Sequence, residues 1–414
     1  MAHETIDTVV IGGGQAGIAT SEHLTRLGVP HLVLERARIA ERWRAERWDS
    51  LVANGPAWHD RFPTREFDAT GPDGFAPAAE IAAYLEAHAQ GFAAPIRTGT
   101  AVNRLTRRDD GRFVAETADA TIVARHVVVA TGPFQNPVIP PLIPAEAGIA
   151  QIHSAHYRNP GQLPPGGVLV IGAGSSGVQI ADELNRAGRR VWLAVGPHNR
   201  PPRRYRGRDF VWWLGVLGKW DETLEQSRAR QAGGDHVTIA VSGAHGGHTV
   251  DFRALAAQGI TLVGRATACR GTTMHFADTL PALIAAGDAD YLATLREADA
   301  YVAREGLDLP TEPEAHVIAP DPACIRDPLT ELDLRAAGIG AVVWATGYGH
   351  DYGWLAIDTF DADGAPRHTR GASPVPGLYF VGLPGLTRRA SAFIWGVWHD
   401  AREIAETIFS RCDA

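Results

Sequence analysis

The sequence predicts an α/β protein made of two Rossmann-like dinucleotide-binding domains, with the second domain inserted into the first. A unit of strand, glycine-rich turn, helix and strand occurs twice, at residues 8–35 and 168–195. Two later apolar strands each end in Ala-Thr-Gly, at residues 130–132 and 345–347. A last strand and a helix with apolar periodicity follow residue 377. Alternating strands and helices of this kind build parallel sheets that are covered by helices.

The first unit carries the spacing GxGxxG after a β-branched strand over residues 8–11. Gly12 permits the tight turn, Gly14 lets the backbone approach a pyrophosphate, and Gly17 lets helix and strand pack closely. Glu35 ends the next strand and can accept a hydrogen bond from an adenosine ribose hydroxyl. The unit therefore predicts a bound dinucleotide, and its further predicted contacts are Gln15, Ala16, Arg36 and Trp43.

The same unit recurs 160 residues later, counted from Gly12 to Gly172, without a gap. Gly174 and Gly177 take the other two glycine positions, and Val195 stands where the first unit has Glu35. Because one such turn holds one pyrophosphate, two units predict two dinucleotides. The helix of the second unit opens with two further predicted contacts, Ser175 and Ser176.

The two units differ where the adenosine ribose binds. A carboxylate such as Glu35 would repel a 2′-phosphate, whereas arginines can bind one through a bidentate fork. Five arginines follow Val195, so we predict FAD in the first unit and NADPH in the second. A solvated loop is the alternative interpretation of these arginines, and the choice among them stays open. The predicted phosphate ligands are Arg200, Arg203 and Arg204, with Arg206 and Arg208 behind them.

Both Ala-Thr-Gly turns are predicted to pass close to a dinucleotide and to cross between the domains. The helix expected from Ala392 to Ile408 would aim its N-terminus at the flavin pyrimidine edge, where negative charge builds up on reduction. Ser391 is the expected N-cap of that helix. These segments add predicted cofactor contacts at Ala130, Thr131, Gly132, Ala345, Thr346, Gly347, Gly382 and Ser391.

The positions of the two units divide the chain into three parts. We expect the N-terminal part of the FAD-binding domain over residues 1–158 and its C-terminal part over residues 336–414. The NADP(H)-binding domain is expected between them, over residues 159–335.

Composition restricts the partners and the compartment. The formal charge of -8 gives no reason to expect nucleic acid or an anionic membrane. The three cysteines lie far apart without a CxxC, so neither a redox dithiol nor a metal site is predicted. No basic and apolar leader begins the chain, and the longest apolar run, residues 210–218, is too short to span a bilayer. We expect a cytoplasmic protein without a membrane span; a homodimer is allowed but not specified.

Over nearly its whole length the sequence resembles the class B flavin-dependent monooxygenases, which include the flavin-containing amine and sulfide monooxygenases and their bacterial relatives. Both fingerprints, both Ala-Thr-Gly turns and the Gly382 region carry the resemblance. The FxGxxxH motif of that family is degenerate, because His153 matches while Ala147 and Ile149 replace the Phe and the Gly. The Gly-Gly-x-Trp motif is altered as well, and residues 157–159 depart from the Baeyer–Villiger subgroup.

The resemblance implies a catalytic role for Asn54. Residues 43–63 resemble the family segment that runs under the flavin, in which an Asn supports the peroxyflavin. An amide can donate to a peroxide oxygen without titrating. The alternative is an Asn-Gly turn formed with Gly55. Further expectations are that His153 orients backbone at the domain junction, and that a substrate pocket is walled by Trp58, Trp395 and Trp398.

The resemblance implies that NADPH and O2 are used to oxygenate a small organic substrate through a C4a-(hydro)peroxyflavin. The altered Baeyer–Villiger motif favours oxygenation at nitrogen or sulfur. Baeyer–Villiger or decarboxylating oxygenation of a carbonyl substrate, as in the similar plant indole-pyruvate enzymes, stays an alternative. An FAD-dependent NAD(P)H reductase that passes electrons to a protein or quinone also stays open, because the missing CxxC excludes only the disulfide type. The remaining alternative is a non-catalytic sensor.

Overall fold

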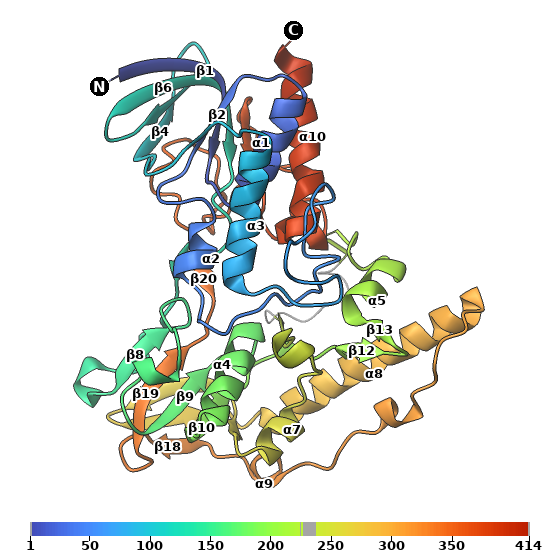
Figure 1. The fold of residues 1–414 in the computed structure, drawn as a ribbon. Coiled ribbons are helices and arrows are strands. Elements are labelled where there is room, and N and C mark those ends of the chain that lie inside the picture. The colour runs from blue at the N-terminus through green and yellow to red at the C-terminus, as the bar shows by residue number, and fades with distance from the viewer. Residues whose placement is uncertain (1, 224, 227–236, 413–414) are drawn as a thin grey trace.

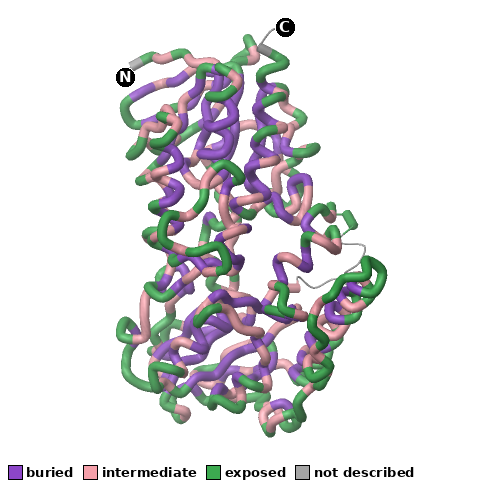
Figure 2. Tube along the Cα trace, turned by 45° about the vertical axis from the view of Figure 1, so that its right-hand side comes forward, coloured by how far each residue is buried: buried purple, intermediate pink, exposed green. Residues whose placement is uncertain are grey.

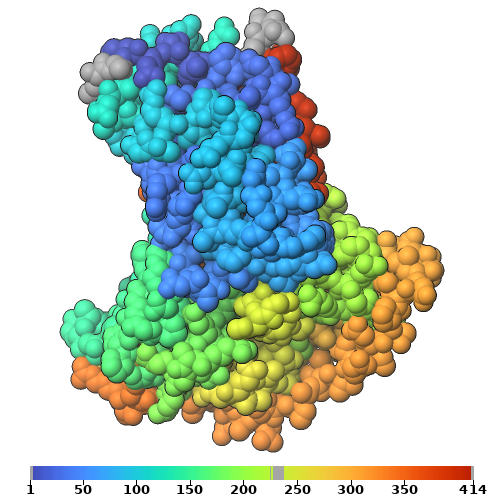
Figure 3. All heavy atoms as spheres, in the orientation of Figure 1, coloured from blue at the N-terminus to red at the C-terminus, as the bar shows by residue number. Residues whose placement is uncertain are grey.

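The computed structural model describes residues 2–223, 225–226 and 237–412, and it confirms the predicted fold class of two dinucleotide-binding α/β domains. Figure 1 shows one sheet with its helices in the upper half and a second sheet with its helices in the lower half. In the space-filling view the two halves form lobes that meet at a waist, the upper one mainly blue and the lower one green to orange (Figure 3). Buried chain fills the centre of both lobes (Figure 2).

The first sheet has seven strands in the order β3-β2-β1-β6-β5-β4, with β21 also paired to β6. β1 lies between β2 and β6 and is parallel to both. β6 pairs with antiparallel β5 through its first half and with parallel β21 through its second half. The strands are β1 (Ala2–Ile11), β2 (His31–Leu34), β3 (Ile96–Arg97), β4 (Arg104–Arg107), β5 (Phe113–Glu116), β6 (Ala120–Val129) and β21 (Leu378–Phe380).

Three helices cover one face of the first sheet (Figure 1). Side chains alternate along a strand, so Val10 and Val128 pack under these helices while Val9 and Val127 face the other core. A buried carboxylate also joins the helices, because Glu22 on the first accepts hydrogen bonds from side chains of the other two. The helices are α1 (Gln15–Arg26), α3 (Ala78–Gly91) and α10 (Ile394–Cys412), and the short α2 (Glu41–Ala45) precedes α3.

The second sheet has five parallel strands in the order β15-β10-β9-β19-β8. Its glycine turn leads from β9 into α4, as the first turn leads from β1 into α1. The strands are β8 (Ala150–His153), β9 (Gly167–Ile171), β10 (Val191–Ala194), β15 (Thr261–Val263) and β19 (Ile339–Trp344). The helices are α4 (Ser175–Arg186), α5 (Phe210–Val216), α7 (Phe252–Ala257), α8 (Leu280–Glu305) and α9 (Ala323–Arg326). A small antiparallel sheet adds β16 (Ala266–Arg270), β17 (Thr273–Phe276) and β18 (Glu331–Asp333).

Strand pairing bears on the expected domain boundaries at 158/159 and 335/336. β8 and β19 both pair within the second sheet, although the expected boundaries assign them to the first domain. The two crossings between the domains lie side by side, as β7 (Asn136–Pro137) pairs antiparallel with β20 (Tyr348–Gly349). The boundaries remain a proposal, and this pairing favours moving them out to the two crossings. Among the helices of the described ranges, none has both the length and the apolar character that a membrane crossing needs.

Candidate dinucleotide and flavin site

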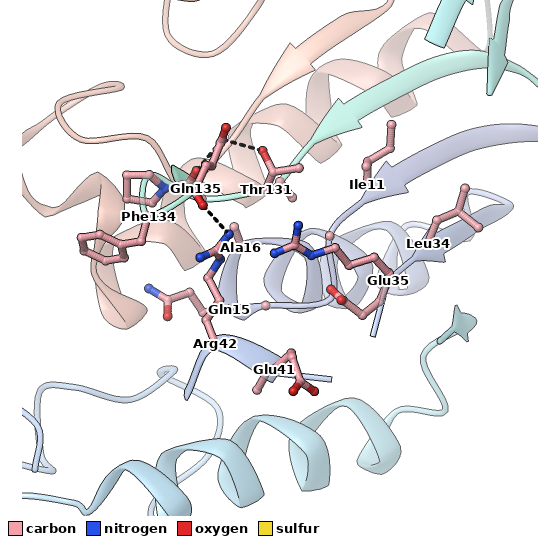
Figure 4. Close-up of a pocket in the computed structure, with 18 of the residues that line it drawn as sticks. Ile11, Gln15, Ala16, Leu34, Glu35, Glu41, Arg42, Thr131, Phe134 and Gln135 are labelled. Atoms are coloured by element: carbon pink, nitrogen blue, oxygen red, sulfur yellow. Dashed lines mark hydrogen bonds between the residues drawn. The ribbon is translucent and has the colours of Figure 1, made fainter. Parts of the chain in front are cut away.

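A cavity of about 300 Å³ opens at the carboxyl end of the first sheet, where β1, β2 and β6 end beside the N-terminus of α1. Dinucleotides bind at this edge of parallel sheets. Figure 4 shows side chains from these separate segments around the opening. The predicted cofactor residues that line the cavity are Gly12, Gly14, Gln15, Ala16, Glu35, Arg36, Trp43, Ala130, Thr131, Gly132 and Gly382.

The first glycine turn leaves space for a phosphate group. Gly12 has a φ of +116°, and a Cβ there would lie 2.5 Å from the carbonyl oxygen of Ala130. A Cβ at Gly17 would lie 1.8 Å from the carbonyl oxygen of Gly12, which shows how closely helix and strand approach. By contrast, a Cβ at Gly14 would meet no other atom within 4 Å. The turn therefore fits a pyrophosphate held over the N-terminus of α1.

The carboxylate of Glu35 is fixed at the wall of the cavity, where the residue is only 8% exposed. One oxygen accepts a hydrogen bond from the backbone N–H of Gly13 at 2.6 Å, and the other accepts one from Ala37 at 2.8 Å. An ionised carboxylate only accepts, and each oxygen keeps a lone pair beyond these bonds. Glu35 is thus placed to accept from a ribose hydroxyl and to repel a 2′-phosphate.

Gln15 links the start of α1 to the C-terminal segment. Its Nε2 donates to the carbonyl oxygen of Ala392 at 2.9 Å, and its Oε1 accepts from the indole N–H of Trp43 at 3.3 Å. Both partners are far from Gln15 in the sequence. The contacts bring Trp43 and the turn before α10 to one end of the cavity.

Polar and aromatic residues that the sequence analysis missed complete the wall. Arg42 donates to the carbonyl oxygen of Gln135 at 3.2 Å, and the side chain of Gln135 donates to Thr131 Oγ1 at 3.0 Å (Figure 4). The guanidinium of Arg47 lies 5.3 Å from the ring centroid of Trp43. In the sequence, the arginines close to Trp43 are the only feature that indicates these additional cavity-lining residues. Other missed lining residues are Thr100, Val102, Phe134, Asp351 and Trp354.

Ser391 is not the N-cap of the last helix, which corrects the sequence prediction. It lies in a 3-10 turn, Arg389–Ala392, and Phe393 then adopts an extended conformation, so that α10 begins only at Ile394. The buried Oγ of Ser391 accepts from the backbone N–H groups of Thr387 and Arg388, both at 3.1 Å. Ser391 shapes the turn before α10 and does not line the cavity.

The second glycine turn repeats the backbone geometry of the first. Gly172 has a φ of +108°, and a Cβ there would lie 2.4 Å from the carbonyl oxygen of Ala345. A Cβ at Gly177 would lie 1.7 Å from the carbonyl oxygen of Gly172. Ala345 is thus the counterpart of Ala130, and each Ala-Thr-Gly turn lies against the first glycine of its own unit. The predicted Thr346 and Gly347 follow at the returning crossing.

The N-terminus of α4 differs from that of α1 because another segment lies over it. A Cβ at Gly174 would lie 3.3 Å from the Cβ of Thr238, and Ser175 Oγ donates to the carbonyl oxygen of Ile239 at 2.9 Å. These two covering residues form β14 (Thr238–Ile239), which pairs with β11 (His198–Asn199). Ser176 occupies the first turn of α4 and is partly exposed.

The predicted phosphate-binding arginines do not form one cluster. Arg200 is 2% exposed and binds Asp288 at 2.6 Å and Asp251 at 3.3 Å. Arg203 is equally buried and pairs with Asp209. Of the three predicted ligands, Arg204 alone has an exposed side chain. The two buried guanidiniums neutralise carboxylates of their own domain, which differs from the role predicted for them.

His153 orients backbone at the domain junction, as the sequence analysis predicts. Its Nδ1 accepts from the backbone N–H of Ala155 at 3.1 Å, so its Nε2 carries the hydrogen and donates to the carbonyl oxygen of Gly347 at 3.0 Å. Burial lowers the pKa of His153 and favours this neutral form. The histidine therefore connects the end of β8 to the returning crossing.

Asn54 lies in a loop that other segments hold firmly, and it does not line the cavity. Gln179 on α4 donates to its side-chain oxygen at 2.8 Å, and Arg203 donates to its main-chain oxygen at 2.6 Å. The backbone N–H of Gly55 donates to Asp60 at 2.9 Å. Neither Asn54 nor Gly55 has the positive φ of a type I′ Asn-Gly turn. The hydrogen bonds described for Asn54 engage only its oxygen atoms.

An aromatic cluster follows Asn54 along the chain. His59 is 6% exposed, its Nδ1 lies 2.9 Å from Asp60 Oδ1, and its ring stacks on Trp220 with centroids 4.8 Å apart. Its Nε2 has no hydrogen-bond partner among the described residues. Trp398 lies elsewhere, since its indole donates to Glu22 in the core between the helices. Two of the three predicted wall residues do join this cluster, namely Trp58 and Trp395.

Comparison with known proteins agrees with this architecture. Residues 9–206 match the pyridine nucleotide-disulphide oxidoreductase family. The solved flavin-containing monooxygenase from Stenotrophomonas maltophilia has the same fold, with a TM-score of 0.67 and 21% identity over 99% of both chains. Two sheets, each with a glycine turn at its carboxyl edge, give this chain the two-domain fold of that flavin-containing monooxygenase.

The chain belongs to the family of the CzcO-like oxidoreductases. An uncharacterized CzcO-like oxidoreductase of Geobacillus kaustophilus is 32% identical over 409 residues, which cover 98% of this chain and 99% of that protein. A shorter match reaches a probable indole-3-pyruvate monooxygenase, YUCCA1 of Arabidopsis thaliana. It is 33% identical over 184 residues, or 43% of this chain and 44% of that protein.

Proposed function

We propose that the protein is an NADPH- and O2-dependent flavin monooxygenase that inserts one oxygen atom into a small organic substrate at nitrogen or sulfur. FAD would occupy the cavity at the first glycine turn, and NADPH would bind at the second turn. The observation that carries the proposal is the pair of glycine turns, the first at an open cavity with Glu35 fixed on its wall and the second with Val195 at the matching position. Asn54 adds to it, because its oxygen atoms are both engaged by the protein. Its amide nitrogen is then the group left to donate a hydrogen bond, as stabilising a flavin-bound oxygen requires.

Bound together, the cofactors would supply the redox chemistry, with NADPH as the reductant and the reduced flavin as the group that activates O2. The protein contributes binding, orientation and exclusion of water. Gly14 and Glu35 would hold the pyrophosphate and ribose of FAD, and Gly172 and Gly174 would hold NADPH. Asn54 would donate to the activated oxygen.

A carbonyl substrate is the second candidate. The match to a plant protein named as a probable indole-3-pyruvate monooxygenase favours it, and that match spans less than half of this chain. The altered motif at residues 157–159 favours nitrogen or sulfur instead. Parallel assays with tertiary amines, sulfides, ketones and 2-oxo acids, each with product identification, separate the two.

Replacing Asn54 tests the proposed function at its central residue. Asn54→Leu keeps a similar volume but removes the donor, so NADPH should reduce the flavin at nearly the normal rate. The transient absorbance formed with O2 should then decay faster, because losing one such donor costs roughly 2–4 kcal/mol of stabilisation. Consumed NADPH should appear as H2O2 in place of oxygenated product.

The matched control is Asn185→Leu, since Asn185 on α4 donates only to the carbonyl oxygen of Gln258, at 3.0 Å. We expect this variant to keep the normal H2O2 yield. An Asn54→Leu variant with full flavin content and an unaltered transient would remove Asn54 from the catalytic residues. Full electron transfer to a quinone without any oxygenated product would instead support a reductase.

A further inference from the structure

The hydrogen bonds around Gln179 determine which way the amide of Asn54 faces. Gln179 lies on α4 and is 8% exposed. Its Nε2 donates twice, once to the carbonyl oxygen of Val241 at 2.8 Å and once to the side-chain oxygen of Asn54 at 2.8 Å. A backbone carbonyl can only accept, so the nitrogen of Gln179 must face Val241. The second hydrogen of the same nitrogen then requires an oxygen atom from Asn54.

This chain of contacts leaves a single orientation for Asn54. If its amide turned over, two NH2 groups would face each other, and the buried Gln179 would lose an acceptor at a cost in stability. With the oxygen held by Gln179, the NH2 group of Asn54 points the other way. Arg203 fixes the main-chain oxygen of the same residue, so the backbone of the loop is also held.

We propose that Gln179 is a positioning residue, which keeps the NH2 group of Asn54 toward the activated flavin. The inference rests on the proposed function, because it assigns a purpose to the orientation of Asn54. Gln179 is the fifth residue of the helix that begins at the second glycine turn. The helix that would bind NADPH therefore also determines which way the side-chain amide of Asn54 faces.

Two substitutions at Gln179 separate polarity from packing. Gln179→Glu keeps the shape, but its carboxylate only accepts, so it should attract the NH2 group of Asn54 and turn the amide around. Gln179→Met keeps the length and removes both donors. We expect both variants to retain flavin and to be reduced by NADPH within about twofold of the wild-type rate, because neither glycine turn is changed. Both should release several times more H2O2 per NADPH consumed.

A double-mutant cycle decides whether Gln179 acts through Asn54. In the Asn54→Leu background, adding Gln179→Met should not change the H2O2 yield further. A second cycle uses thermal unfolding of the flavin-free proteins. Here the sum of the two single-variant shifts in melting temperature should exceed the shift of the double variant. This readout needs no cofactor chemistry and reports the hydrogen bond directly. Asn185→Leu on the same helix serves as the control and should leave the yield of H2O2 unchanged.

The outcomes separate this inference from the proposed function. If Asn54→Leu raises the H2O2 yield while both Gln179 variants keep the wild-type yield, the positioning role is wrong and the proposed function stands. Additive effects of Asn54→Leu and Gln179→Met would likewise overturn the positioning role. If Asn54→Leu itself has no effect on the yield, the role of Asn54 in the proposed function fails, and the inference about Gln179 fails with it.

Discussion

A side chain at Gly14 would project into the space that we assign to the FAD pyrophosphate. Gly14→Val should therefore give a folded but colourless protein, with flavin absorbance below about a tenth of the wild-type value. The corresponding variant Gly174→Val, whose added side chain would also contact Thr238, should keep its flavin and lose reduction by NADPH. Flavin content per protein, measured by absorbance after denaturation, checks the first expectation, and anaerobic reduction checks the second. A fully flavinylated Gly14→Val protein would show that this turn does not hold FAD.

The structure changes the prediction of which arginine binds the 2′-phosphate of NADPH. The strand β15 pairs with β10 so that Ala194 lies opposite Val263, which places the exposed Arg265 next to the position that matches Glu35. In the first domain, the matching segment after β3 contributes Thr100 to the cavity. We expect Arg265→Ala to raise the KM for NADPH about tenfold, roughly 1.5 kcal/mol for a charged hydrogen bond, and to leave NADH unaffected.

Steady-state kinetics with both nucleotides measure this effect, and Arg204→Ala is the comparison variant. A larger effect at Arg204 would assign the phosphate to that arginine, as the sequence analysis proposed. Equal use of NADH and NADPH by the wild-type protein would contradict the choice of NADPH. Arg200→Ala should instead lower the free energy of unfolding by at most about 3 kcal/mol, because the buried Asp288 loses one of its two arginine partners and keeps Arg253 at 2.8 Å.

How much of the site the sequence predicts depends on the range of the interaction. The spacing of the glycine turns is predictable because Gly17 approaches the carbonyl oxygen of Gly12, only five residues earlier in the chain. The role of Arg200 is not, because its partner Asp288 lies 88 residues away and no local pattern signals the pair. Gln179 lies inside the recognised helix, yet its partner Asn54 is 125 residues earlier in the chain.

At the scale of elements, the packing of α1 against α10 predicts sensitivity to acid. His23 on α1 packs edge-on against Trp398, with ring centroids 4.3 Å apart, and its Nε2 donates to the carbonyl oxygen of Trp398 at 3.1 Å. Burial lowers the pKa of His23 to about 4. Between its ordinary pKa of about 6.5 and pH 4, the unfolded chain binds a proton that the folded protein does not bind. The free energy of unfolding should therefore fall as the pH drops through this window.

Chemical denaturation at a series of pH values measures the slope. The full shift corresponds to roughly 3 kcal/mol between pH 6.5 and 4. His23→Gln should flatten that part of the curve, whereas His156→Gln, at an exposed position, should not change it. Glu22 affects the free energy of unfolding only at lower pH than His23 does. Burial alone would raise its pKa, but hydrogen bonds from His88 and Trp398 outweigh burial and lower the pKa to about 2. An unchanged slope in His23→Gln would contradict this account of the interface.

Elements at the domain junction are the least predictable from sequence. The strands of both glycine units lie where their apolar patterns indicate, since each pattern is local. The placement of β8 depends on its pairing with β19, 191 residues later, so its domain could not be assigned from its own residues. The start of α10 shifted for a related reason: Ser391 binds backbone of the preceding turn, which delays the helix to Ile394.

At the scale of the whole molecule, the two dinucleotide units are not equivalent. The first turn faces an open cavity, with a carboxylate fixed on its wall. The second has no acid at the matching position, and its helix supports the loop of Asn54. From this asymmetry we expect the two turns to bind different dinucleotides.

The incorporation of oxygen from 18O2 tests the monooxygenase claim most directly. Purified protein with FAD and NADPH would be supplied with 18O2 and with the amine or sulfide that most increases NADPH oxidation, and the product would be analysed by mass spectrometry. We predict that the product gains one 18O atom per NADPH consumed, less the fraction released as H2O2. A product without 18O, or NADPH oxidation that only reduces an added quinone or yields only H2O2 across amines, sulfides and carbonyl compounds, would contradict the claim.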